Sequence, residues 1–332
     1  MAATLADVAR RVGVSSMTVS RVFRSTGSVS KDTREQVLAA GAALRYAPNL
    51  LARGLVQNRT TTIGVVVLEL ANPYFSAMVG GIQAACAKMG FMTVVGESGR
   101  DADAERRYVE QFRQFRVSGI IVNPVSRWLN HLSEARDGGT PVVVMERHWN
   151  KGDCVATDDV LGGQFVAQHF LDRGYDRIGL VRFADPDHSA IRARVGGFRH
   201  KLETAGVSIP PEWDLQVLGS SIESGMAVAE QLISGGHCPR ALFVTSDRLA
   251  MGVIHQLLHH GIRVPQDVAI VGYDDIPFAA CAQVPLTTVA TPKRGLGEMS
   301  VKLLFNRIDE AAPTERQRIV LSPQLVVRES SP

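Results

Sequence analysis

A group of short polar side chains and one arginine lies near the N-terminus, in the segment VGVSSMTVSRVFR at residues 12–24. Hydroxyl groups hydrogen-bond to phosphate oxygens, and an arginine can donate two hydrogen bonds to the O6 and N7 atoms of a guanine. Short side chains at the start of a helix also let that helix approach a large partner closely. An ordinary solvated helix face is the alternative. The group consists of Ser15, Ser16, Met17, Thr18, Ser20 and Arg21.

Other residue pairs have spacings that occur in enzymes or metal sites, but each lacks a necessary partner. His255 and His259 are four residues apart, yet no glutamate follows the first histidine as in HExxH, so neither a metal nor a cofactor is expected. The acidic pairs at 158–159 and 274–275 are sequence neighbours, whose side chains point to opposite faces of a strand. The sequence contains no GxxxxGK[ST] and no GxSxG motif. The pattern therefore does not indicate an enzyme.

The elements that hold the N-terminal group are predicted to be short helices. Thr4 is a good N-cap residue, Asp7 lies three positions later to complete a capping box, and Gly13 ends the helix. A second helix begins at VSS with its valines facing inward, and a third follows Ser30. Two helices joined by a glycine turn predict a helix-turn-helix, whose second helix enters the major groove of DNA. We expect Thr4 to contact DNA as well.

Charge is distributed unevenly along the chain. The first 60 residues carry nine basic and three acidic side chains, a net charge of +6, whereas the rest carries 27 basic and 30 acidic ones, a net charge of −3. A small basic N-terminal segment on a slightly acidic body indicates a polyanionic partner for that segment alone. Together with the helix pattern, this favours DNA binding over a solvated face.

From Thr62 onward, apolar runs alternate with helical segments. Continuous Val/Ile strands between helices predict parallel sheets covered on both faces, and the number of elements favours two doubly wound subdomains over one sheet. Ligands of such sheets bind beyond the carboxyl ends of the strands, where ELANPYF, NPVS, MERHW, TSD and GYDD occur. The predicted strands are 62–69, 91–97, 118–124, 141–147, 177–183, 215–219, 241–247 and 268–275. The predicted helices are 74–90, 102–115, 162–174, 191–206, 247–261 and 294–308.

The stretch PNLLARGLVQNRT after residue 47 joins the two parts. It is weakly amphipathic, and Gly54 makes it a marginal helix that would need a partner to stay folded. One hypothesis is a plain linker. The other is a hinge helix that folds on DNA, places Asn49, Ala52 and Arg53 in the minor groove and inserts Leu55 between base pairs. The physics of the sequence alone favours neither.

Several segments in a fixed order resemble the LacI/GalR family of bacterial repressors. The segment from TLADVARRVG through PNLLARGL resembles the DNA-binding and hinge region of that family, and the match continues through TIGVVVLELANPYFSAMVGGI, VATDDVLGG, ALFVTSDRLAMG, RVPQDVAIVGYDD and PLTTV. The resemblance implies a homodimer on a near-palindromic double-stranded DNA operator, with Leu55 as the intercalating residue at a central CpG step. It also implies a core similar to periplasmic sugar-binding proteins, which closes around a small effector.

The expected fold class is therefore α/β, with an all-α helix-turn-helix and hinge helix followed by two doubly wound parallel-sheet subdomains of the periplasmic-binding-protein type. The expected boundaries are 1–47 for the helix-turn-helix domain, 48–60 for the hinge and 61–332 for the core. Within the core, the N-subdomain is expected at about 61–161 and 292–321, and the C-subdomain at about 162–291 and 322–332.

The resemblance also implies an effector site. Asp274 in GYDD and Arg194 in RARVGGF match positions that usually hold effector hydroxyls or a carboxylate, and carboxylates with a guanidinium suit a polyol. The alternatives are that Asp247 caps the helix starting at Arg248 and that Asp274 holds its own turn. The other expected effector-binding residues are Tyr74, Phe75, Asn123, Glu146, Ser246 and Asp247.

Two departures from the family pattern add positive charge near that site. Arg147 follows Glu146, and His188 lies just before SAIRAR on a strand-end loop. These residues suggest an anionic effector, such as a sugar acid or a sugar phosphate. A solvent-facing Arg147 would remove the argument.

The sequence as a whole predicts a DNA-binding transcriptional regulator, a repressor controlled by a sugar-type effector. Release from DNA and tighter binding on effector addition both fit. The competing class is a solute-binding protein without DNA function, which explains the core but neither the basic helix-turn-helix nor the lack of a secretory signal pattern in MAATLADVARRVG. No run of apolar residues is long enough to span a membrane, and a cytoplasmic, nucleoid-associated location in a bacterium is expected.

Overall fold

The computed structural model describes residues 3–24, 26–47, 60–126, 128–183, 189–236, 238–309 and 315–332. The chain divides into two compact units, Met1–Thr60 and Thr61–Pro332, which we call the head and the core. Each unit is described by itself. Among the residues described, no helix combines the length and apolarity needed to cross a membrane.

Within its described residues the head contains three short helices, α1 (Leu5–Val12), α2 (Ser16–Arg24) and α3 (Lys31–Ala43), which confirm the three that the sequence predicts. The helices form where capping residues and a small apolar stripe coincide. Ser30 caps α3 by accepting a hydrogen bond from the Thr33 N–H, and Gly13 ends α1 with a left-handed φ of 75°. The three helices bury one small cluster, made of Val8, Ala9, Val19, Val22, Val37 and Ala40.

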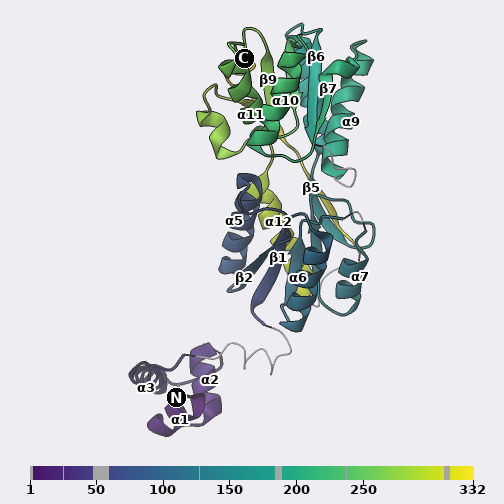
Figure 1. The fold of residues 1–332 in the computed structure, drawn as a ribbon. Helices are drawn as coiled ribbons and strands as arrows, with labels where there is room; N and C mark the ends of the chain where they lie inside the picture. Colours follow the sequence, from purple (N-terminus) through teal and green to yellow (C-terminus); the bar gives the residue numbers. More distant parts are fainter. Residues whose placement is uncertain are drawn as a thin grey trace. The chain divides into compact units, whose positions relative to one another are not determined.

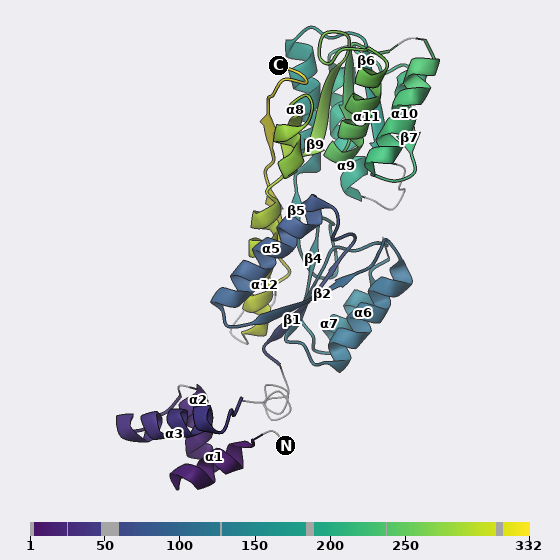
Figure 2. The ribbon, with the colours of Figure 1, turned by 60° about the vertical axis from the view of Figure 1, so that its left-hand side comes forward.

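The first sheet of the core has six strands in the order β11-β5-β4-β3-β1-β2, all parallel. Helices α5 and α12 pack together on one face of this sheet, and α6 and α7 lie on the other (Figure 2). We call this layered unit the N-subdomain. Its strands are β1 (Thr62–Val67), β2 (Met92–Glu97), β3 (Gly119–Val122), β4 (Val142–Met145), β5 (Asp153–Thr157) and β11 (Arg318–Leu321), and its helices are α5 (Pro73–Lys88), α6 (Ala102–Gln114), α7 (Asn130–Asp137) and α12 (Lys293–Ile308).

The second sheet has the order β12-β10-β9-β8-β6-β7, parallel except for β12, and we call its layered unit the C-subdomain (Figure 1). Helices α8 and α9 pair with each other, as do α10 and α11. Its strands are β6 (Ile178–Phe183), β7 (Asp214–Val217), β8 (Ala241–Val244), β9 (Ala269–Asp274), β10 (Thr287–Ala290) and β12 (Gln324–Val326). Its helices are α8 (Asp159–Asp172), α9 (Ser189–Thr204), α10 (Ile222–Ser234) and α11 (Asp247–His259), with the 3₁₀ turns η1 (Pro211–Trp213) and η2 (Pro277–Cys281).

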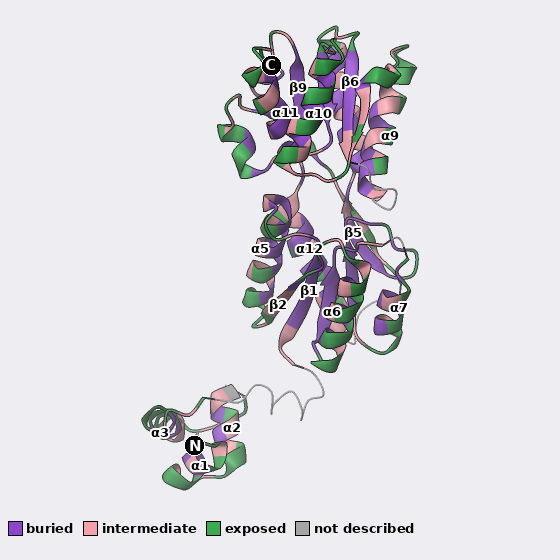
Figure 3. Ribbon diagram, in the orientation of Figure 1, coloured by how far each residue is buried: buried purple, intermediate pink, exposed green. Residues whose placement is uncertain are grey.

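Central strands of both sheets are buried along their whole length, as in β3, β4, β8 and β9 (Figure 3). This burial explains why their sequences are mostly continuous apolar runs, such as GIIV in β3, VVVM in β4 and ALFV in β8, rather than alternating patterns. The expected α/β class with two doubly wound sheets is confirmed. The eight predicted strands and six predicted helices are present, whereas β5, β10, β11, β12, α7 and α10 were not predicted as elements because they are short or lack a clear period.

Within the described residues of the core, the chain passes between the two subdomains three times. It leaves the N-subdomain after β5, returns between β10 and α12, and crosses again between β11 and β12. Because the first sheet takes its last strand from residues 318–321, neither subdomain is one continuous stretch of sequence.

Candidate functional site

In the head, Thr4 is used to start α1. Its hydroxyl accepts a hydrogen bond from the Asp7 N–H, and the Asp7 carboxylate accepts one from the Thr4 N–H at 2.9 Å. These reciprocal bonds are the capping box expected from the sequence, and the hydrogen bonds from the Thr4 side chain and N–H hold the pKa of the Asp7 carboxyl below its ordinary value. The structure therefore places Thr4 at the helix end as a capping residue.

The outer surface of α2 carries the other predicted residues of the head. Ser15 accepts a hydrogen bond from the Thr18 N–H at 3.1 Å and so caps the helix, while Ser16, Met17 and Arg21 are exposed. Val19 and Val22 fill the opposite face and are buried in the cluster of the head. Thr18 and Ser20 lie between these two faces and are half-buried.

Arg21 lies against the loop after α2. Its Cδ atom lies 3.5 Å from the position that a Cβ atom on Gly27 would occupy, and Gly27 has a φ of 74°. A Cβ atom there would make only an ordinary contact with the arginine, so it is the left-handed φ that favours glycine at this position, and Arg21 remains exposed. The four predicted hinge residues Asn49, Ala52, Arg53 and Leu55 lie outside the described residues.

In the core, one cavity is lined by residues of both subdomains and encloses about 520 Å³ of empty space open to solvent. The predicted residues that line it are Tyr74, Phe75, Asn123, Glu146, Arg194, Ser246 and Asp274. The lining residues that the sequence interpretation missed are Asn72, Arg100, Phe183, Ala190, Ile191, Ser220 and Thr245.

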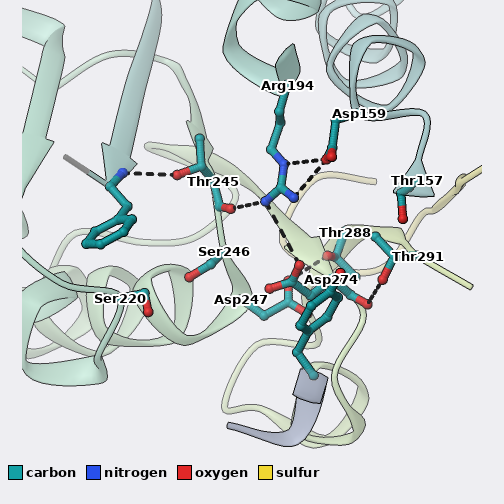
Figure 4. Close-up of polar contacts among 12 residues, drawn as sticks. Thr157, Asp159, Arg194, Ser220, Thr245, Ser246, Asp247, Asp274, Thr288 and Thr291 are labelled. Carbon is teal, nitrogen blue, oxygen red and sulfur yellow. Dashed lines mark hydrogen bonds and ion pairs between the residues drawn. The ribbon is translucent and has the colours of Figure 1, made fainter. Parts of the chain in front are cut away.

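Arg194 on α9 is the buried cation of this cavity (Figure 4). Its Nε and Nη2 atoms donate to one carboxylate oxygen of Asp159 at 3.0 and 2.8 Å, and its Nη1 atom donates to the Thr245 carbonyl at 2.6 Å. The Asp274 carboxylate lies 3.9 Å from Nη1, and the guanidinium stacks 3.4 Å from the centre of the Tyr273 ring. Burial acts to lower the pKa of Arg194, but the attraction of Asp159, Tyr273 and Asp274 together outweighs it and raises that pKa, so the side chain stays charged.

Two glycines explain how Arg194 reaches Asp159 from a different helix. A Cβ atom on Gly163 of α8 would lie 1.9 Å from the Arg194 carbonyl oxygen, and one on Gly197 of α9 would lie 2.1 Å from the Val160 carbonyl oxygen. Helices α8 and α9 therefore cross with their backbones in contact, which is possible only without side chains at these positions.

Glu146 follows β4 on the opposite wall of the cavity. Its backbone adopts a left-handed φ of 58°, and its carboxylate accepts a hydrogen bond from the Thr157 hydroxyl at 3.0 Å. Burial, with repulsion from Asp159 added, raises the pKa of Glu146 to about 8. Tyr74 is buried nearby, and burial followed by the charge of Glu146 raises the pKa of its phenol well above the ordinary value.

Asn123 adds an unused hydrogen-bond acceptor to the cavity. Its side-chain nitrogen donates to the Met145 carbonyl at 3.4 Å, whereas its Oδ1 atom is buried and has no hydrogen-bond partner among the described residues. A buried acceptor without a partner is costly, so a ligand that donates to it gains affinity.

Asp274 and Asp247 lie close together but face different surroundings. Asp274 lines the cavity with a strained φ of 114°, and burial raises its pKa to about 7. Asp247, which was also expected to bind the effector, does not line the cavity: it is fully buried, and its carboxylate accepts from the Ile276 N–H at 2.8 Å and the Thr288 hydroxyl at 2.5 Å. The alternative that Asp247 caps its helix is wrong, because Ser246 is the N-cap and its hydroxyl accepts from the Leu249 N–H.

Two arginines make contacts that join the subdomains at the cavity. The guanidinium of Arg100 lies 4.9 Å from the centre of the Phe183 ring, and its Nη2 atom is 3.4 Å from the Ser220 hydroxyl. Arg248 at the start of α11 donates to the Glu69 carboxylate at 2.6 Å. Arg100 follows β2 as a strand-end residue, and this position is a signal that could have identified it from the sequence.

The expectation of an anionic effector depends on two residues, and the structure places neither in the lining of this cavity. Arg147 is buried but does not belong to the lining, and His188 lies outside the described residues. No group of His, Cys, Asp and Glu side chains suited to a metal ion occurs among the residues that the structure describes.

Comparisons with known proteins agree with this arrangement. A family model described as "Bacterial regulatory proteins, lacI family" matches residues 4–49, and one described as "Periplasmic binding protein-like domain" matches residues 167–331. The ribose operon repressor of Escherichia coli (strain K12) is 34% identical over 340 residues, covering 99% of this chain and all of that protein. The transcriptional repressor PurR of Photobacterium profundum is 33% identical over 334 residues, covering 99% of this chain and 98% of that protein.

A solved structure also matches over the whole chain. The lac repressor dimer bound to operator and the anti-inducer ONPF has a TM-score of 0.89 at 28% identity and covers 100% of this chain and 99% of its own. The relatives named here are transcriptional repressors rather than enzymes.

Proposed function

The chain belongs to the lacI family of bacterial regulatory proteins and is a DNA-binding transcriptional repressor, and we propose that a polyol effector in the core cavity sets its affinity for an operator. The observation that carries this proposal is that one cavity is lined by both subdomains. A ligand bound there contacts both subdomains at once, so it favours one relative position of the two.

The side chains of the cavity indicate a hydroxyl-rich ligand. Glu146, Asp274 and the free oxygen of Asn123 accept hydrogen bonds, and Arg194 of α9 donates. Tyr74 and Phe75 offer an apolar ring surface, and their rings stand edge-to-face at 5.1 Å. This combination of acceptors and an aromatic wall suits a sugar.

For the DNA, we propose that α2 enters the major groove as one of a pair in a homodimer. Ser15, Ser16 and Met17 then face base edges, Thr18 and Ser20 hold phosphates, and Arg21 contacts a guanine. Residues 48–60 act as the hinge, with Asn49, Ala52 and Arg53 in the minor groove and Leu55 inserted between base pairs. A repressor of bacterial DNA works in the cytoplasm, on a near-palindromic operator.

The two sites are linked through the core. An effector that changes the relative position of the subdomains changes the spacing of the two hinges in the dimer. A coupling of about 1–3 kcal/mol between the sites is enough to control occupancy. A positive and a negative coupling both fit this mechanism, so the effector either releases the repressor from the operator or tightens its binding to the operator.

Selection of DNA from a random duplex library with the full-length protein tests the DNA half of this proposal. We expect enrichment of a near-palindromic sequence and an affinity that falls steeply with salt. Leu55→Ala should lose DNA bending and most of the specific affinity. Failure to enrich any sequence would refute the DNA-binding half.

Thermal unfolding across a panel of sugars, sugar acids and sugar phosphates tests the effector half. A ligand at one hundred times its dissociation constant adds about 2.7 kcal/mol, which raises the melting temperature by roughly 5 °C for a core of this size. Asn123→Leu removes the unpartnered acceptor and should abolish the shift. The control Asn306→Leu, which changes an exposed asparagine on α12, should keep it. A shift that survives Asn123→Leu would place the ligand elsewhere.

A further inference from the structure

The exposed face of α2 carries one large apolar side chain among short polar ones. Met17 is 65% exposed and is not part of the hydrophobic cluster that holds the head together. Its neighbour Ser16 is also exposed, and the hydroxyl of Ser15 is bonded to the Thr18 hydroxyl at 2.9 Å. Met17 therefore extends further from the start of α2 than the serines beside it, without stabilising the fold of the head.

Met17 and Arg21 are four residues apart, so they lie one turn from each other on the same side of α2. Both are exposed, and the aliphatic part of Arg21 lies against Gly27. The net charge of +6 on the first 60 residues attracts this surface to DNA. A thioether has no hydrogen atom to donate to a phosphate and its sulfur is only a weak acceptor, so the contact that Met17 makes is mainly apolar.

The major groove offers one apolar group that identifies a base, which is the C5-methyl group of thymine. We propose that Met17 contacts a thymine methyl in each half of the operator, beside the guanine contacted by Arg21. This inference rests on the proposed DNA-binding function and adds a base preference to it. The exposed methionine is then a determinant of sequence specificity.

Replacing thymine by deoxyuridine tests the contact directly, because it removes only the methyl group. The full-length protein first selects its operator from a random duplex library, and each thymine of the half-site is then replaced in turn. Loss of one buried methyl contact should weaken binding about fourfold in one half-site, the equivalent of about 0.8 kcal/mol. Replacement in both half-sites should weaken it about 15-fold.

Two variants assign the effect to Met17. Met17→Ala should bind the thymine and deoxyuridine operators equally, whereas Arg21→Ala should keep the fourfold difference and lose its preference for the guanine. Met89→Ala, which changes a methionine of the core that is 57% exposed, should behave as the unaltered protein. A selected operator that binds equally with and without each thymine methyl would overturn the inference while leaving the DNA-binding function intact. A difference that survives in Met17→Ala would also overturn it, and a selection that enriches nothing would overturn both.

Discussion

Glu146 is a single residue whose surroundings and backbone conformation lower the stability of the folded protein. Its carboxylate is buried beside Asp159, its backbone has a left-handed φ, and its pKa is raised to about 8. The folded protein therefore keeps the Glu146 proton up to about pH 8, while the unfolded chain releases it near the ordinary pKa of a glutamate. Between those values the folded state binds more protons, so the free energy of unfolding falls as the pH rises.

Glu146→Gln should remove this dependence. We expect unaltered protein and variant to have similar melting temperatures at pH 5, and the variant to become more stable by about 2–4 kcal/mol towards pH 9. The amide can still accept the Thr157 hydrogen bond, so the cavity keeps its shape. Thermal unfolding as a function of pH measures the gap, with the exposed Glu298→Gln as control. A gap that stays constant with pH would contradict the raised pKa.

The single residues of the cavity differ in how well the sequence predicts them. Glu146, Ser246 and Asp274 lie at or just after the ends of buried strands, and the carboxyl ends of parallel strands meet at one edge of a sheet. Arg100 and Ser220 follow the edge strands β2 and β7, whose mixed burial gives a weaker pattern. Hydrogen-bond partners are not predictable in this way, because they depend on distances that no sequence period encodes.

At the scale of elements, pairs of helices in the core meet through reciprocal glycines. Helices α10 and α11 cross in the same way as α8 and α9. A Cβ atom on Gly225 of α10 would lie 2.1 Å from the Leu249 carbonyl oxygen, and a Cβ atom on Gly252 of α11 would lie 2.0 Å from the Ile222 carbonyl oxygen. The sequence shows glycines inside helices, which cost about 0.5–1 kcal/mol each relative to alanine. It does not show which glycine of a pair such as Gly196–Gly197 makes the contact.

The two adjacent glycines of α9 should respond to alanine in opposite ways. Gly197→Ala places a methyl group on the Val160 carbonyl, which should destabilise the core by about 1–3 kcal/mol and move Arg194 away from Asp159. Gly196→Ala meets no atom within 4 Å and should stabilise it by up to about 1 kcal/mol. Urea unfolding measures both. Equal effects of the two substitutions would contradict the close crossing.

At the scale of the whole core, side chains beside the cavity connect the two subdomains. Glu69 comes from the loop after β1 and Arg248 from the start of α11, 179 residues apart in sequence, and their side chains are 28% and 21% exposed. Such a half-buried ion pair acts only when the subdomains are close together. It therefore adds to the stability of this arrangement without contacting an effector.

A double-mutant cycle with Glu69→Gln and Arg248→Gln should detect this connection. The expected coupling is about 0.5–1 kcal/mol at low salt and declines as salt is added, because the pair is partly solvated. Urea unfolding at two salt concentrations measures this coupling. A second cycle with Glu69→Gln and Arg240→Gln is the control, because those two side chains do not contact each other. Additive effects of the first pair at low salt would mean that the two side chains do not meet in solution.

The three passages between the subdomains also have a consequence for the order in which the newly made chain can fold. The head needs only its own first residues, since its three helices end at Ala43 and its contacts are local. The N-subdomain sheet takes its outer strand from residues 318–321, and α12, which packs on that sheet, ends at Ile308. During synthesis on the ribosome, the head can therefore be complete while the core still waits for the last 30 residues or so. A nascent repressor would then present a finished head before it has the core that regulates it.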